Sequence, residues 1–178
     1  MSPAQASGWV GELARQHLDA AYNLGRWLLG NEHDAADAVH DAYLRAERAA
    51  QTYAGGNARS WWLAIVRNCC LARLSTRKRE THLHSVDGPA TTHGLTSEVE
   101  ERVHAAQCNT LLAGHLRALP VEFRETLVLR EIEDLSYREI SDVLGVPIGT
   151  VMSRLARGRA LLQKSLGASP PQEIGHGM

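Results

Sequence analysis

The sequence predicts an all-α protein built from two small helical domains joined by a flexible linker. Apolar residues recur at helical spacing, helix-favouring alanine, leucine and arginine are abundant, and no β-rich alternation occurs. The segment THLHSVDGPATTHGLT at 81–96 has little apolar content and separates two such helical stretches. We therefore expect a first domain over 1–80, a linker over 81–104, a second domain over 105–167 and a disordered tail over 168–178.

In the first domain, the apolar spacing predicts three helices. The first is one amphipathic helix that ends at Gly30-Asn31 and carries Leu13, Leu18, Ala21, Leu24 and Leu28. The second begins at Asp34 and turns inward Ala35, Val39, Ala42, Tyr43 and Ala46. After a Gly55-Gly56-Asn57 loop, a long helix over 58–79 buries Trp62, Ile65, Val66 and Cys69, whereas for Trp61 burial and an exposed stacking role both stay open.

In the second domain, a helix that ends at Pro120 and a second helix precede a helix-turn-helix. The apolar positions of the first are Leu111, Leu112, His115, Leu116 and Leu119, and those of the second are Phe123, Leu127, Val128 and Ile132.

The segment 135–162 has the pattern of a helix-turn-helix. Ser136 and Glu139 form a capping box, Ile140, Val143 and Leu144 form an apolar stripe, Gly145 ends the helix and Pro147 opens the next one. At about 100° per residue, one face of the second helix is apolar, with Val151, Leu155, Gly158 and Leu162. The other faces carry small and basic residues and suit the major groove of DNA, although two short helices with a glycine turn also occur in ordinary bundles.

Charge is distributed unevenly along the chain. The formal net charge is −1, but the segment from Arg59 to Arg79 carries six basic residues and no acidic one, between two acidic stretches. This alternation predicts one face for DNA, other faces for protein, and weak DNA affinity of the chain by itself.

Several other classes of function are disfavoured. Three cysteines form no disulfide framework, and no signal peptide or membrane-spanning run is present, so we expect a reduced, cytoplasmic protein without membrane insertion. No Ser-His-Asp, paired-carboxylate or phosphate-loop arrangement is evident, so we expect neither enzymatic activity nor a cofactor. The spacing of the cysteines with His82, His84, His93 and His104 does not suit a closed metal site, and Cys69 is expected to be the more buried of the adjacent pair Cys69 and Cys70.

Three segments together resemble a known family. DAADAVHDAYLRA, then SWWLAIVRNCCLARL after a Gly-Gly loop, then LPVEFRETLVLREIEDLSYREISDVLGVPIGTVMSRLARGRALL, look like a group IV (extracytoplasmic function, ECF) sigma factor of bacterial RNA polymerase. The resemblance covers Trp9 to Leu166. It implies a sigma region 2 domain, a sigma region 4 domain, promoter-specific initiation on core RNA polymerase, and control by an anti-sigma factor.

The resemblance also implies roles for particular residues. Contact with the beta-prime clamp helices of core polymerase would use Asp37, His40, Asp41 and Arg45. Reading of the melted −10 element would use Trp61, Asn68, Arg73, Arg77 and Lys78. Reading of the −35 element would use Thr150, Met152, Ser153, Arg154, Ala156 and Arg157, while region 4 would also meet the beta flap.

Two alternatives compete with this interpretation. A conventional helix-turn-helix regulator leaves the first domain unexplained. A sigma-like decoy that sequesters an anti-sigma factor is the second alternative, because Ala72, Ser75 and Met152 differ from the residues common in the family. Asn68, Ser153, Arg154 and Arg157 favour a promoter-reading protein.

Overall fold

The computed structural model describes residues 3–83 and 110–167, and those residues contain helices and no strand. The first helical group consists of α1 (Pro3–Gln16), α2 (Leu18–Leu29), α3 (Glu32–Ala49), the short 3₁₀ helix η1 (Ala50–Thr52) and α4 (Ala58–Leu83). The second consists of a helical segment over 110–118, α6 (Val121–Leu127), its π-helical continuation η2 (Val128–Ile132), α7 (Tyr137–Leu144) and α8 (Ile148–Gly167). The all-α, two-domain expectation is confirmed.

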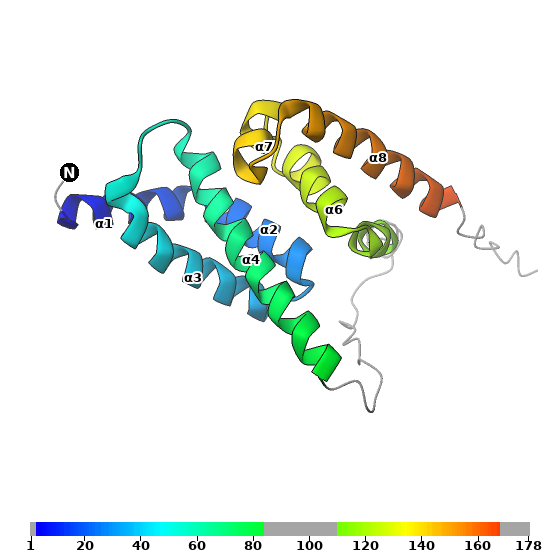
Figure 1. Ribbon diagram of the computed structural model, residues 1–178, viewed down its shortest axis with the longest axis horizontal. Helices are drawn as coiled ribbons and strands as arrows, with labels where there is room; N and C mark the ends of the chain where they lie inside the picture. Colours follow the sequence, from blue (N-terminus) through cyan, green and yellow to red (C-terminus); the bar gives the residue numbers. More distant parts are fainter. Residues whose placement is uncertain (1–2, 84–109, 168–178) are drawn as a thin grey trace, which may run out of the picture.

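Helix α4 is the central element of the structure. It packs against α2 and α3 on one side and against α7 on another, so that the two helical groups lie directly against each other (Figure 1). Buried apolar residues of both groups belong to one continuous cluster. The two helical groups are therefore in contact, which the expectation of two linked domains left unspecified.

The expected single helix ahead of Gly30 is wrong, because the chain forms two helices there. His17 leaves the helical conformation at φ −118° and ψ 25°, and α2 begins at the following residue. Leu18 consequently leaves the inner stripe and is 49% exposed. Gly30 ends α2 at φ +82°, a left-handed conformation that glycine adopts without a Cβ clash, and the Asn31 side chain caps α3 through the amide of Asp34.

The inner faces of α3 and α4 largely follow the expected spacing. Trp62 and Val66 are fully buried, the four expected alanine and valine positions of α3 are buried, and Tyr43 and Ile65 are partly buried. The expectation for the cysteines is wrong: Cys70 is at least as buried as Cys69. Both thiols are enclosed because α4 has neighbours on more than one side.

Three expected core positions of the second domain are exposed instead. Leu111, Leu112 and Ile132 are 51%, 41% and 42% exposed, whereas Leu116 and Leu119 are buried. Leu112 and Ile132 line a cavity of about 520 Å³.

Candidate nucleic-acid interface

Local hydrogen bonds fix the turn of the helix-turn-helix. The Ser136 hydroxyl accepts from the amide of Glu139 at 3.2 Å, and the Ser136 amide donates to Glu139 Oε2 at 2.8 Å, which completes the expected capping box. The backbone hydrogen bond to Ser136 is the main reason that the pKa of Glu139 is lowered. Gly145 ends α7 at φ +66°, as expected for a left-handed cap.

Ser141 forms hydrogen bonds at the other end of this turn. The sequence patterns did not indicate this role for Ser141. Its hydroxyl donates to the carbonyl of Val146 at 2.6 Å, and its carbonyl accepts from the amide of Gly145 at 2.9 Å. Pro147 immediately precedes α8, and its carbonyl accepts from the amides of Thr150 and Val151. The angle between α7 and α8 is thus held by bonds within one short stretch of chain.

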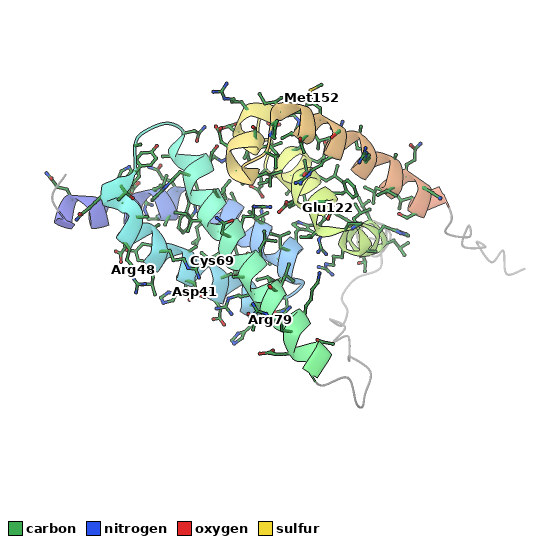
Figure 2. The ribbon with its side chains drawn as sticks, in the orientation of Figure 1. Asp41, Arg48, Cys69, Arg79, Glu122 and Met152 are labelled. Carbon is green, nitrogen blue, oxygen red and sulfur yellow. The ribbon has the colours of Figure 1, made fainter. Side chains whose placement is uncertain are left out.

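The outer face of α8 is open to solvent. Met152 is 53% exposed and projects from the outer side of the helix, away from α4 (Figure 2). Ser153, Ala156 and Arg157 are exposed beside it, while Val151 and Leu155 are buried on the inner face. An open, mostly small surface with one arginine can approach base edges closely.

Thr150 and Arg154 lie on one flank of α8, between its outer and inner faces, and are only partly exposed. Arg154 Nη1 is 3.6 Å from Glu125 Oε1, so this arginine faces the buried carboxylate of α6. Arg159, on the other flank, donates to Glu131 Oε1 at 2.5 Å. Both flanking arginines are therefore paired with a carboxylate of the same helical group, and Arg157 is exposed on the outer face.

Asn68 is exposed on α4, on the same side as the half-buried Trp61. Trp61 belongs to a three-ring cluster whose centroids are 5.0 Å (Trp9–Tyr53), 5.5 Å (Trp9–Trp61) and 5.1 Å (Tyr53–Trp61) apart. Trp9 did not stand out in the sequence, because its spacing from Trp61 follows no local period. The cluster leaves Trp61 partly accessible, as a stacking surface requires.

Hydrogen bonds hold both ends of the loop that precedes α4. The Tyr53 hydroxyl donates to the carbonyl of Gly56 at 2.7 Å, and Asn57 Oδ1 accepts from the amide of Ser60 at 3.0 Å. Gly55 and Gly56 adopt φ +91° and +102°, which other residues rarely tolerate. Aromatic rings and fixed backbone groups therefore lie at the start of α4, about two turns before Asn68.

The basic cluster at the end of α4 divides between two faces. Arg73 Nη2 donates to Asp41 Oδ2 at 2.7 Å and Arg77 pairs with Asp34, so both arginines lie against α3. At about 100° per residue they point more than a third of a turn away from Asn68, whereas Arg79 falls on the same side as Asn68. Lys78 is exposed between these directions. Arg79 is thus a further candidate for nucleic-acid contact.

The four residues that the sequence assigns to polymerase contact all lie on α3. Asp37, His40 and Arg45 are exposed, and Asp41 is partly covered through its bond with Arg73 (Figure 2). His40 also borders a groove of about 630 Å³ between α1, α2 and α3. This surface lies on the other side of the molecule from Met152, so protein and DNA contacts need not compete.

Neither described cysteine has the character of a reactive thiol. Burial raises the pKa of Cys69, and burial together with the neighbouring Cys69 raises the pKa of Cys70 to about 12. His84, His93, His104 and Cys108 lie outside the described residues, as does the side chain of His82. Within the described residues, no helix combines the length and apolarity needed to cross a membrane.

Comparisons with known families match both helical groups. A model of sigma-70 region 2 matches residues 13–80, and a model of sigma-70 region 4 matches residues 112–162. The ECF RNA polymerase sigma factor SigE of Mycolicibacterium smegmatis is 37% identical over 155 residues, which cover 87% of this chain and 60% of that protein. The ECF RNA polymerase sigma factor SigW of Bacillus subtilis is 32% identical over 160 residues, which cover 84% of each chain.

Two solved structures share the fold over most of the chain. CnrH, solved in complex with the cytosolic domain of CnrY, matches with a TM-score of 0.65 and 25% identity over 94% of this chain and 96% of that one. The sigma factor RpoE, solved with the anti-sigma factor NepR from Bartonella quintana, matches with a TM-score of 0.68 and 22% identity over 89% and 97% of the two chains.

Proposed function

Because the chain belongs to the ECF sigma factors of the sigma-70 family, we propose that it binds core RNA polymerase in the cytoplasm and directs transcription initiation at specific promoters. The observation that carries this proposal is the presence of two separate candidate reading surfaces in one chain. One is the open face of α8, and the other is the Asn68 face of α4 with its aromatic cluster. The proposed action is recruitment and opening of DNA, without catalysis by this chain.

The two surfaces suit different forms of DNA. The small side chains around Met152 and Arg157 allow α8 to enter the major groove of a duplex at the −35 element. Asn68, the partly accessible Trp61 and the basic end of α4 suit an unpaired strand, where bases stack and phosphates meet cations. We assign this second surface to the melted −10 element.

Protein partners complete the proposal. The surface of α3 that carries Asp37, His40, Asp41 and Arg45 would dock on the beta-prime clamp helices, and region 4 would meet the beta flap. CnrH and the Bartonella quintana RpoE were solved with CnrY and with the anti-sigma factor NepR, respectively. We infer that an anti-sigma factor also controls this chain.

The test is run-off transcription with purified core polymerase on the promoter upstream of the gene for this chain. Transcription should depend on the protein and fall with Arg157→Ala, since a good arginine–base contact is worth about 1–3 kcal/mol. Asn68→Ala should reduce opening of the −10 element on the same template. Arg159→Ala is the matched control on α8, because Arg159 pairs with Glu131 and should leave transcription near the wild-type level.

The same assay distinguishes a promoter-reading sigma factor from the sigma-like decoy. Its supporting observation is the exposed thioether of Met152 in the middle of the candidate reading face. Binding to core polymerase with no transcription from any genomic template would favour the decoy. Failure to bind core polymerase at all would overturn the sigma factor proposal.

A further inference from the structure

Two large apolar side chains are exposed together on α8. Ile148 is 39% exposed and Met152 is 53% exposed, and Met152 projects away from α4 (Figure 2). The two residues are four positions apart, so at about 100° per residue their directions differ by only about 40°. The side chains with which α8 packs on its own domain, Val151 and Leu155, are buried on the inner face. Ile148 and Met152 therefore form a second apolar surface on the same helix, here called the outer apolar pair.

The outer apolar pair lies among small side chains. Gly149 separates its two members by less than a turn, and Ser153 and Ala156 are exposed beside Met152. The Ser153 hydroxyl donates to the carbonyl of Thr150 at 3.0 Å, so its proton is already used within the helix. These small neighbours leave the ends of the two apolar side chains open to a partner.

Two arginines near the outer apolar pair face carboxylates of their own helical group. Arg154 Nη1 lies 3.6 Å from Glu125 Oε1. Arg159, which lies two turns beyond Met152, donates through Nε to Glu131 Oε1 at 3.1 Å. Either guanidinium would have to leave its carboxylate before it could bind a base. The surface around Met152 is therefore apolar rather than cationic.

The rest of α8 indicates that the partner of this face is negatively charged. Between residues 148 and 167 the helix has four basic residues and no acidic one. Arg157 is exposed on the outer face, about 7.5 Å further along the helix axis than Met152. The major groove of DNA has phosphates along its edges, and the apolar group that a base presents in it is the C5-methyl of thymine. DNA therefore supplies both the charge and the apolar group that this face can contact.

We propose that Met152, supported by Ile148, is a specificity-determining residue of region 4 that contacts the C5-methyl group of a thymine in the −35 element. This inference rests on the proposed function, because it takes the outer face of α8 as the surface that reads that element. Methionine is unbranched and polarizable, so its thioether can adapt to the position of a methyl group in the groove. The contact gives an apolar residue a role at the centre of the reading face.

The proposed contact also predicts what a change of residue 152 does to base preference. An arginine in the major groove donates two hydrogen bonds to O6 and N7 of guanine, which a methionine cannot do. Met152→Arg should therefore exchange a preference for thymine at one base pair for a preference for guanine. Arg157 meets a different base pair, because about 7.5 Å spans two steps of about 3.4 Å between successive base pairs.

The test replaces single thymines of the −35 element by deoxyuridine, which lacks the C5-methyl and keeps every hydrogen-bonding group. The probe is a fluorescent duplex with the −35 element of the promoter used for run-off transcription, and the protein is the full chain bound to core polymerase. For wild type, deoxyuridine at one position should weaken binding about fourfold, the effect expected for about one buried methyl group. Met152→Ala should bind the thymine and deoxyuridine duplexes equally.

Leu161→Ala is the matched control. Leu161 is also an exposed apolar residue of α8, but it lies nine positions from Met152 and thus about half a turn around the helix. This variant should keep the fourfold effect of deoxyuridine, since it leaves the outer apolar pair unchanged. Met152→Arg should bind more tightly than wild type to a duplex with guanine in place of the sensitive thymine.

Several outcomes would overturn the inference. Transcription that depends on the chain, together with equal binding of every deoxyuridine duplex by wild type, would overturn it and leave the proposed function intact. An equal loss for wild type and Met152→Ala would assign the methyl contact to another residue. Self-association of wild type but not of Met152→Ala in sedimentation, without a deoxyuridine effect, would assign the pair to a second copy of the chain. Failure of the run-off assay is a different result, which overturns the proposed function and this inference together.

Discussion

Arg73 of α4 donates a hydrogen bond to Asp41 of α3 at 2.7 Å, and its other terminal nitrogen lies 3.7 Å from Asp37. One residue expected to bind DNA is therefore paired with two residues expected to bind polymerase. The geometry assigns Arg73 to the α3 surface, where its charge holds the two carboxylates in position.

Arg73→Ala should consequently weaken binding to core polymerase. The loss should be roughly 1 kcal/mol, about fivefold in the dissociation constant, because the pair is partly exposed. Competition against a labelled sigma factor measures this affinity, and Arg79→Ala provides the comparison on the Asn68 side of α4. A variant that binds core normally but fails to open the −10 element would show that Arg73 contacts DNA after all.

Two substitutions of Trp62 should distinguish how much its packing and how much its unpartnered indole N–H affect the free energy of unfolding. Trp62 is fully buried, and its indole nitrogen has no hydrogen-bond partner within the described part of the chain. Trp62→Ala should lower the free energy of unfolding by about 3–5 kcal/mol, whereas Trp62→Phe should cost only about 1–2 kcal/mol because it also removes the unpartnered N–H. Urea denaturation measures both, and equal losses would contradict the role given to the indole nitrogen.

Two glycines inside helices should respond in opposite directions to alanine. A Cβ on Gly25 would lie 3.1 Å from the Cβ and 3.2 Å from the Cα of Ala35, so α2 and α3 would have to move apart. Gly25→Ala should therefore cost about 1–2 kcal/mol. Among the described residues, no neighbouring element comes within 4 Å of a Cβ on Gly114, and Gly114→Ala should instead gain about 0.5–1 kcal/mol from helix propensity. Thermal unfolding of the two variants would show the opposite shifts, and a gain for both would exclude close packing at Gly25.

The junction between α1 and α2 should make stability depend on pH. Partial burial and the nearby charge of Arg59 lower the pKa of His17 below its ordinary value of 6.5. The unfolded chain then takes up the proton first, so the free energy of unfolding should fall as the pH decreases through about 6.5. His17→Gln cannot titrate and should lose less stability between about pH 7.5 and pH 5.5. An identical loss in the variant would show that other groups cause the dependence.

The sequence by itself determined the features whose causes are local. The Ser136–Glu139 capping box, the left-handed Gly145 and the apolar stripe of α8 involve residues within a few positions of one another, so the helical period and the hydrogen-bonding side chains specify them directly. Burial of Trp62 followed from the same period. The break at His17 did not, because no glycine, proline or capping motif marks it.

Only the tertiary structure decided which charges meet. Arg73 and Asp41 are 32 residues apart, and Arg67 and Glu125 are 58 apart. Helical periodicity says which face a residue occupies but not which distant helix packs on that face, since that depends on how whole apolar surfaces fit together. The division of the α4 arginines between α3 and the second helical group is therefore a property of the packed molecule.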